Sequence, residues 1–431
     1  MRLEEYWGVG PKTRRRLEES IGAEAAVEAI ESANGRKLVE AGLSRGRATR
    51  ILRRANSGAG MDLLATGDTR DVYRSLVERV GEYAVTDHAR DRIRVLTPLL
   101  SEERIEERLD RVLDARDSWA GLDEATRESV LGAFEEYDST GGERSAVEAA
   151  LALRDAGVTE GVFEPLGDLD AEALREGASA LAALDDGSVR EGADEELDAR
   201  RSQLRAVEDL EGSALDLLEE LREGGVRESG EFREAFREHL RAETDLDGDR
   251  LREAMPEGAT DAADFVGTTL RELRTDLRAA VEEREEAVAA DLRETVEATR
   301  EEVDAAVAAV DDVAFYVSLA RFAVDRDLVR PEFCEDGLAV VGARNLDIDP
   351  GAVQPVDYAV GDHGLDGDLP DERVAVLTGA NSGGKTTLLE TLCQVALLAQ
   401  MGLPVPAERA RVSVVDAVVF HRRHASFNAG V

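Results

Sequence analysis

The stretch Gly379-Ala380-Asn381-Ser382-Gly383-Gly384-Lys385-Thr386 decides how the C-terminal part of the chain is interpreted. An apolar run at 374–377 precedes it, and residues 386–401 follow it with helical periodicity. Glycines allow successive backbone N–H groups to surround phosphate oxygens at the start of a helix. A lysine adds charge near the β- and γ-phosphates, and a Ser or Thr hydroxyl can bind Mg²⁺. The pattern predicts a P-loop that binds a nucleoside triphosphate.

The predicted ATP ligands share one loop and the first turn of the helix after it: Gly379, Asn381, Ser382, Gly383, Gly384, Lys385, Thr386 and Thr387. Thr386 is the predicted Mg²⁺ ligand. Hydrolysis also needs an acidic residue at the end of a later strand. Asp416 is the acid nearest to a predicted strand, but its place at the strand start makes it a poor candidate. No catalytic residue is therefore assigned.

Three apolar segments of the C-terminal region are predicted strands, at 338–341, 374–377 and 412–420. Together with the helix from 386 they indicate that residues 331–431 form the first part of an α/β P-loop ATPase domain. The chain as a whole has 34 % charged and 4 % aromatic residues, a composition that favours long solvated helices. The predicted fold is thus mostly α, followed by an incomplete α/β domain.

The charge of the chain restricts its environment and partners. It carries 93 acidic and 53 basic residues, and Lys12, Lys37 and Lys385 are its only lysines. Such a composition is typical of proteins from salt-accumulating archaea, so we expect a halophilic protein. No segment is apolar enough to cross a bilayer, which predicts a cytoplasmic protein without membrane contact. Cys334 and Cys393 have no metal-ligand spacing and are expected to be buried thiols.

Breaks in the helical pattern suggest domain boundaries. Residues 56–60 resemble a linker between a small domain at 1–58 and a helical core at 61–255. Neither Gly nor Pro occurs between Thr268 and Arg330, so the region 256–330 is predicted to form one long helix or two nearly continuous helices.

The N-terminal segment Trp7-Gly8-Val9-Gly10-Pro11-Lys12-Thr13 fits a helix-hairpin-helix pattern, whose glycines expose backbone amides to a DNA phosphate. Residues 41–48 resemble a second copy, with Ser44 where glycine is usual. Residues 1–58 carry 12 basic and 8 acidic residues, a local excess of positive charge. An alternative is a protein-interaction module with the same hairpins. The predicted DNA-binding residues are Gly8, Gly10, Lys12, Thr13, Arg45 and Arg47.

Three C-terminal motifs resemble those of the MutS family. Residues 377–387 are similar to its TGPNxGGK(S/T)T loop, although Ala380 replaces the proline. Residues 398–408 resemble its LAQxGxxVPAE element, and Asp416 with residues 419–422 resembles its D-x-IF-TR strand. Residues 83–98 look like the start of the family's core domain.

The resemblance implies long helices that act as lever arms and an ATP site completed by the signature loop of a second subunit. The chain would then work as a homodimer or as a MutS-like heterodimer. The sequence stops before the family's Walker B motif and signature loop, so the chain alone is expected to be a poor ATPase. The family's mismatch-reading domain, with its Phe-x-Glu wedge, is not recognisable.

The sequence therefore predicts an ATP-dependent DNA-binding protein of the MutS type, which acts in DNA repair or recombination on branched or damaged DNA. Two alternatives remain open. One is a chromosome-structuring coiled-coil ATPase, although there the P-loop usually precedes the long helices. The other is a truncated, non-catalytic scaffold that binds DNA or a partner.

Overall fold

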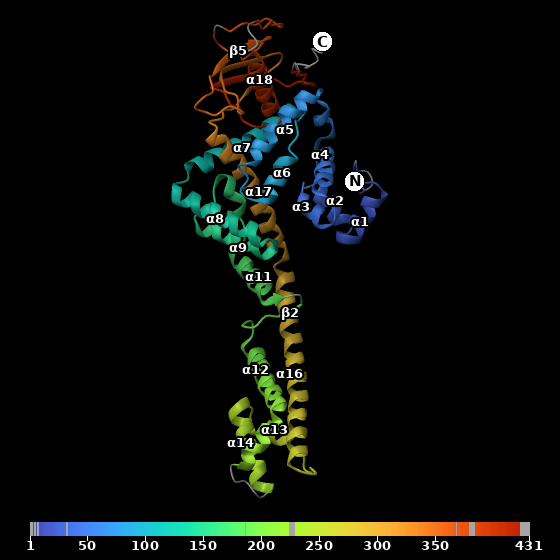
Figure 1. Ribbon diagram of the computed structural model, residues 1–431. Coiled ribbons are helices and arrows are strands. Elements are labelled where there is room, and N and C mark those ends of the chain that lie inside the picture. Colours follow the sequence, from blue (N-terminus) through green and yellow to red (C-terminus); the bar gives the residue numbers. More distant parts are fainter. Residues whose placement is uncertain are drawn as a thin grey trace, which may run out of the picture. The chain divides into compact units, whose positions relative to one another are not determined.

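The computed structural model describes residues 3, 6, 8–31, 33–185, 187–223, 229–367, 369–378 and 384–422. These residues are mostly helical, as predicted (Figure 1). They belong to two compact units. Unit 1 comprises Met1–Leu169 and Asp304–Val431, and unit 2 comprises Asp170–Val303.

Unit 1 starts with four short helices that share an apolar core. They are α1 (Pro11–Ile21), α2 (Ala23–Glu31), α3 (Gly35–Glu40) and α4 (Arg45–Asp62). Leu17, Ile30 and Leu38 are fully buried in this core. The predicted linker at 56–60 is wrong, because α4 continues through it to Asp62. A helical glycine costs only about 1 kcal/mol relative to alanine, so Gly58 and Gly60 weaken the helix without ending it.

The helix α17 (Arg300–Asp325) is buried on nearly all sides between Val310 and Ala323. A helix that is apolar all round belongs in the interior of a domain. Its side chains contact α6 (Asp87–Arg94), α7 (Glu102–Gly121) and α8 (Glu124–Thr140). Further helices of unit 1 are α5 (Gly67–Gly81), α9 (Gly142–Asp155), the 3₁₀ helix η2 (Gly161–Phe163) and α10 (Glu164–Gly167).

Unit 2 is organised along α16 (Ala262–Ala298), a helix of 37 residues. Only Thr299 separates α16 from α17, so the predicted pair of nearly continuous helices is confirmed. The other elements are α11 (Ala171–Ala183), β1 (Leu184–Asp185), β2 (Ser188–Val189), α12 (Glu195–Gly212), α13 (Ala214–Glu223), α14 (Ser229–Thr244) and α15 (Gly248–Ala254). Phe236 and Phe265 pack edge to face, 5.9 Å apart, in its core.

A four-stranded mixed sheet lies in the C-terminal part of unit 1, with strand order β3-β6-β4-β5. Its strands are β3 (Glu332–Cys334), β4 (Leu338–Ala343), β5 (Val356–Val360) and β6 (Arg409–Ser413). β3 and β6 are parallel, and the other two pairs are antiparallel. The helix α18 (Lys385–Gln400) packs against β4. The predicted strand at 338–341 and the predicted helix from 386 are thus confirmed.

Two predicted strands are wrong. Residues 374–377 form no strand, and Val374 and Val376 are 80 % and 82 % exposed. An apolar run becomes a strand only when a neighbouring strand pairs with its amides, and none of the described strands does so. The strand predicted at 412–420 ends at Ser413. Beyond it, Val418 forms an isolated parallel bridge with Leu64.

Among the described helices, none combines the length and the apolar character needed to cross a lipid bilayer.

Candidate functional site

The first turn of α18 carries the described part of the predicted phosphate site. Gly384 is the N-cap residue, with φ +75° and ψ 6°, a left-handed conformation that glycine adopts without strain. Lys385 begins the helix, and Thr386 is exposed beside it. Gly384 has no side chain that could cap the first backbone amides of α18. The direction in which these amides point therefore depends on the contacts that hold the helix. The predicted ligands Gly379, Asn381, Ser382 and Gly383 lie outside the described residues.

Uncharged amide side chains connect α18 to the loop after β4. Asn345, just after β4, donates from Nδ2 to the Thr391 hydroxyl at 3.1 Å and to the Thr387 carbonyl at 3.3 Å. Gln394 Oε1 accepts a hydrogen bond from the Leu346 amide at 3.0 Å. Asn345, Thr391 and Gln394 are all buried. The loop after β4 therefore fixes the helix that begins at Lys385. The sequence analysis missed both amides.

The C-terminal end of α18 is joined to the helical part of unit 1. Gln400 Nε2 donates to the carbonyls of Leu99 and Val415, both at 3.0 Å. Arg108 on α7 donates to the Met401 carbonyl at 2.9 Å, and burial lowers the pKa of its guanidinium. A movement of α18 along its axis would thus pull on α7 and on the segment before it.

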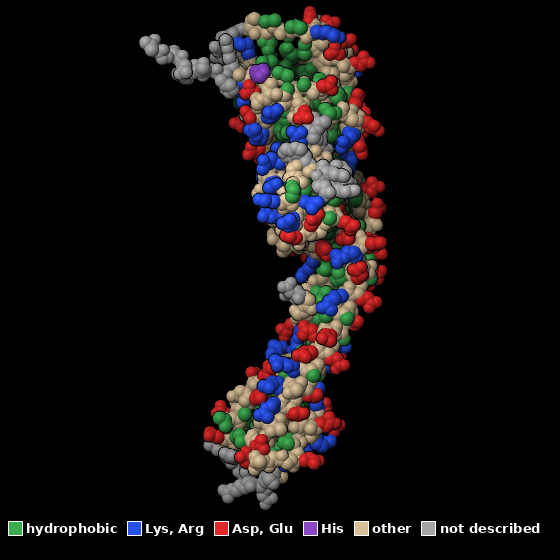
Figure 2. Space-filling model, turned by 90° about the vertical axis from the view of Figure 1, so that its right-hand side faces the viewer, with side chains coloured by type: hydrophobic (Ala, Val, Ile, Leu, Met, Phe, Trp, Pro, Cys, Tyr) green, Lys and Arg blue, Asp and Glu red, His purple; other side chains and the backbone are tan. Residues whose placement is uncertain are grey.

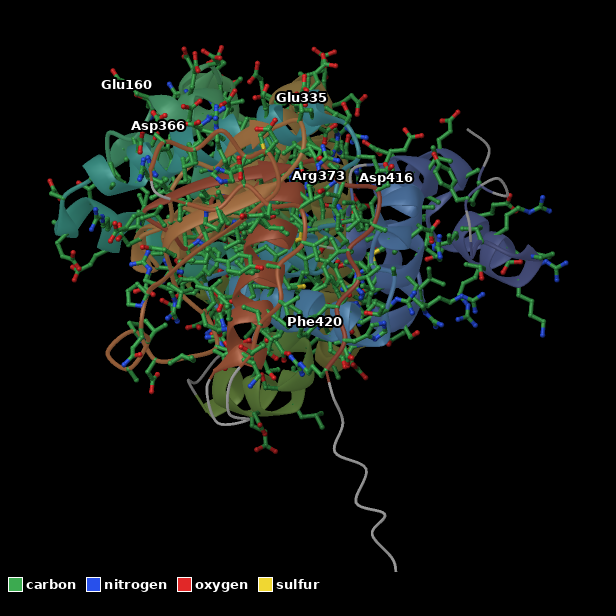
Figure 3. All side chains as sticks on the ribbon, turned by 90° about the horizontal axis from the view of Figure 1, so that it is seen from above. Glu160, Glu335, Asp366, Arg373, Asp416 and Phe420 are labelled. Carbon is green, nitrogen blue, oxygen red and sulfur yellow. The ribbon has the colours of Figure 1, made fainter. Side chains whose placement is uncertain are left out.

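The segment after β6 runs beside α5, as Figure 3 shows for the stretch from Asp416 to Phe420. Asp416 is exposed at a bend outside the sheet, and Phe420 is buried. The Val418 amide donates to the Leu63 carbonyl at 2.8 Å. Arg422 forms an ion pair with Glu390, in the second turn of α18. The sequence analysis did not predict this ion pair between the segment and α18.

Two glycine turns near the N-terminus have the same geometry. Gly8 and Gly42 have φ of +85° and +88°, values that strain any residue with a Cβ. Two residues later, Gly10 and Ser44 have extended backbones and are the N-cap residues of α1 and α4. Neither cap makes a side-chain hydrogen bond to the helix. The first amides of α1 and α4 are therefore left without a side-chain cap in two similar turns.

The two turns also pack against each other's helices. A Cβ on Gly8 would lie 3.2 Å from Ile51 of α4, and a Cβ on Gly42 would lie 3.3 Å from Arg16 of α1. Arg16 Nη1 in addition donates to the Gly42 carbonyl at 2.9 Å. This crosswise packing makes the two turns a single rigid unit.

The predicted residues of this region differ in accessibility. Lys12, Arg45 and Arg47 are exposed at the starts of α1 and α4. Thr13 is only 2 % exposed, and its hydroxyl has no hydrogen-bond partner among the described residues. Thr13 is thus not exposed to a ligand in this structure.

The two thiols differ in burial. Cys393 is buried, as predicted, whereas Cys334 is half-buried. Burial raises the pKa of Cys393 to about 12, so it remains a thiol at neutral pH. Within the described ranges, no group of three or more His, Cys, Asp or Glu side chains is placed to bind a metal.

The segment that contains α18 and β6 is similar to a domain of DNA repair proteins. Residues 375–428 match the family model of MutS domain V. The chain is 45 % identical over 107 residues to the DNA-binding protein MutS2 of Pyrococcus furiosus. This alignment covers 24 % of this chain and 19 % of that protein. These matches support a relation to the MutS family.

Two further relatives are DNA mismatch repair proteins MutS. The protein of Anaeromyxobacter dehalogenans is 36 % identical over 153 residues, or 33 % of this chain and 16 % of the relative. That of Azorhizobium caulinodans is 30 % identical over 254 residues, or 54 % and 26 %. The alignments thus cover between about a sixth and about a quarter of the length of these relatives.

Proposed function

We propose that the chain is an ATP-dependent DNA-binding protein of the MutS type, which acts in DNA repair or recombination and binds DNA structure rather than sequence. The observation that carries this proposal is the match of residues 375–428 to MutS domain V. The matched stretch includes the loop with the predicted ATP ligands and the whole of α18. The names of the relatives, DNA-binding and DNA mismatch repair proteins, support the same function.

At the ATP site, the start of α18 supplies amides and the positive end of the helix dipole to the phosphates. Lys385 adds a compact ammonium at the first helical residue, and the exposed Thr386 hydroxyl is placed to take part in binding Mg²⁺. The bound ion would neutralise phosphate charge. The predicted ligands at 379–383 belong to the same proposed site. The proposal covers nucleotide binding and assigns no catalytic acid for hydrolysis.

At the DNA site, the turns at Gly8 and Gly42 present the uncapped amides of α1 and α4 to phosphate oxygens. Lys12 and Arg45 add charge beside them. Phosphate contacts carry no base information, so recognition of DNA shape rather than sequence follows. Branched or damaged DNA is the proposed substrate, and the working form is a homodimer or a MutS-like heterodimer.

The two sites would be coupled through unit 1. Its helix α18 contacts α7 through Arg108, and α7 in turn contacts α17 through the ion pair of Arg111 with Asp312, at 2.6 Å. Arg92 of α6 binds the same Asp312 at 2.9 Å. Closure of the ATP site would therefore act on helices that also support the N-terminal turns.

The test is a panel of fluorescent DNAs, comprising duplex, mismatch, fork and Holliday junction, titrated with the protein in the presence and absence of Mg·ATP. We expect tighter binding to branched DNA and a change of affinity with ATP that the Lys385→Ala variant loses. Equal affinities for all four DNAs, unaffected by ATP, would remove the proposal.

A further inference from the structure

The helix α4 lies in an unusual part of this acidic chain. Residues 41–61 contain five arginines and neither Asp nor Glu, although acidic residues outnumber basic ones by 93 to 53 in the whole chain. The stretch includes the glycine turn at Gly42, which leads directly into α4. A local excess of arginine in an acidic protein indicates a surface for a polyanion.

Three of the five arginines form a stripe on one face of α4. Arg47, Arg50 and Arg54 are spaced three and four residues apart, so they lie in line on the helix surface, and all three are exposed. Arg53 has a different role, because it donates to the Arg94 carbonyl at 2.8 and 2.6 Å and lies 5.5 Å from the centre of the Tyr73 ring. Arg53 therefore attaches α4 to α5 and α6.

Arginines on the other helices are commonly paired with a carboxylate three or four residues away, as in Arg74–Asp71, Arg90–Asp87, Arg144–Glu148, Arg200–Glu196 and Arg252–Asp249. In the part of the chain that the structure describes, no ion pair joins Arg47 or Arg50 to a carboxylate. Arg50 donates only to the Gly46 carbonyl of its own helix, at 3.1 Å. Arg54 makes an ion pair with Asp62 at 3.6 Å.

In Figure 2, Lys and Arg side chains gather on the part of the surface that the N-terminal helices form. An arginine neutralised by a neighbouring carboxylate attracts an anion weakly. Arg47 and Arg50 have no carboxylate partner among the described residues, so their charge is not offset locally; Arg54, which pairs with Asp62 at 3.6 Å, continues their line on the helix surface.

We propose that Arg47, Arg50 and Arg54 bind successive phosphates of one strand of a duplex DNA arm that leaves the turn at Ser44 along α4. The stripe spans about 10 Å, at about 1.5 Å per helical residue. One DNA strand carries a phosphate about every 3.4 Å along the axis, so about three phosphates fit this length. The inference rests on the proposed DNA binding and deepens it by adding a continuous duplex arm to the contacts at the two turns.

The test is the salt dependence of binding to a fluorescent duplex by the variant R47Q/R50Q/R54Q. We expect affinity at low salt to fall about 10- to 100-fold, and the slope of log K against log salt to lose about 2 to 3 units of magnitude. The variant R144Q/R205Q/R252Q removes the same charge from exposed, paired arginines and should change both quantities far less. Circular dichroism melts of both variants check the fold.

The outcomes separate the two proposals. If the stripe variant keeps the affinity and slope of the parent, or changes no more than the control variant, the phosphate track is overturned while DNA binding through the turns stands. If the parent protein binds none of the DNAs, the proposed function fails as well.

Discussion

The helix α18 and the pair α1 and α4 begin in chemically similar ways but are held in the protein differently. All three start after Gly or Ser without a side-chain cap. Hydrogen bonds between the loop after β4 and α18, made by the buried side chains of Asn345 and Gln394, fix α18, whereas the turns at Gly8 and Gly42 are fixed by packing on each other's helices. A single supported helix start suits one small anion. Two mutually fixed starts suit a polymer whose phosphates occur at regular intervals.

The largest effect is expected at α18. Lys385→Ala removes the ammonium beside the proposed phosphates and should lower ATP affinity about 100-fold, because truncating one partner of a close charge pair costs several kcal/mol. Isothermal titration calorimetry measures the loss, and DNA binding without ATP should persist. Lys37→Ala is the matched control, since Lys37 lies on α3 and pairs with Glu28 at 3.4 Å. If Lys385→Ala keeps full ATP affinity, the start of α18 is not the phosphate site that the comparison assumes.

The complementary change is a carboxylate at the N-terminal turns. Gly10→Asp and Ser44→Asp place a good N-cap residue where neither helix has a side-chain cap, and a Cβ on Gly10 meets nothing within 4 Å. The folded state should not suffer, but the new carboxylate occupies the amides and repels phosphate. We expect DNA affinity to fall about tenfold for each variant, with ATP affinity unchanged.

Fluorescence anisotropy with a labelled fork measures this effect. The control is Ser101→Asp, which adds the same carboxylate to the similarly uncapped start of α7. A loss of DNA affinity as large in the control as in the turn variants would show a general charge effect instead of blocked amides.

The sequence predicted those features that depend on local pattern. The helix after Gly384 and the nearly continuous α16 and α17 follow from periodicity and from the absence of Gly and Pro. The two glycine turns, whose left-handed glycines the structure shows, were recognisable because Gly8 and Gly42 stand directly before similar helix starts. Such features need only a few neighbouring residues to be specified.

Features that depend on distant partners were not predictable. Val418 leaves the sheet because its amide and carbonyl bind Leu63 and Ala65, more than 350 residues earlier in the chain. Residues 374–377 have strand-like composition but no pairing strand among the described residues. At the candidate site, Asn345 and Gln394 carry no sequence signal, because their importance comes from buried hydrogen bonds between α18 and the loop after β4.

The third prediction concerns the support of α18. Gln394→Leu preserves size but leaves the Leu346 amide without its buried acceptor, at a cost of about 1 to 3 kcal/mol. Scanning calorimetry should show a transition lowered by a few degrees. ATP affinity should also fall, since the start of α18 loses a fixed position. Gln203→Leu replaces a half-buried glutamine of α12 and serves as control. An unchanged transition would mean that α18 does not depend on these amides.

The smallest expected effect concerns an ionisable cluster near α3, which is compared with the hydrogen bonds of Asn345 and Gln394 at α18. His88 is buried in α6, with Nε2 3.5 Å from an Asp311 oxygen. Tyr137 donates to the other Asp311 oxygen at 2.9 Å. Burial lowers the pKa of His88 from its usual 6.5, against the opposing effect of Asp311, while Arg92 and Arg36 also lower it and Asp91 raises it. The charged groups around His88 thus come from α3, α6 and α17.

Because the folded pKa of His88 lies below 6.5, the unfolded chain binds more protons between those two values. The contribution of neutral His88 to the free energy of unfolding is therefore fully present above pH 6.5. It is lost as the pH falls from 6.5 through the lower pKa of the folded state. Amide exchange protection, corrected for the intrinsic rate, should decrease in α3 and α6 on acidification more than in α18. His88→Gln should remove most of this difference, and His239→Gln on α14 should retain it. If α18 loses as much protection as α3 and α6, both in the parent and in His88→Gln, acid acts through carboxylates throughout unit 1. The difference between the His88 cluster and the contacts of α18 then does not hold.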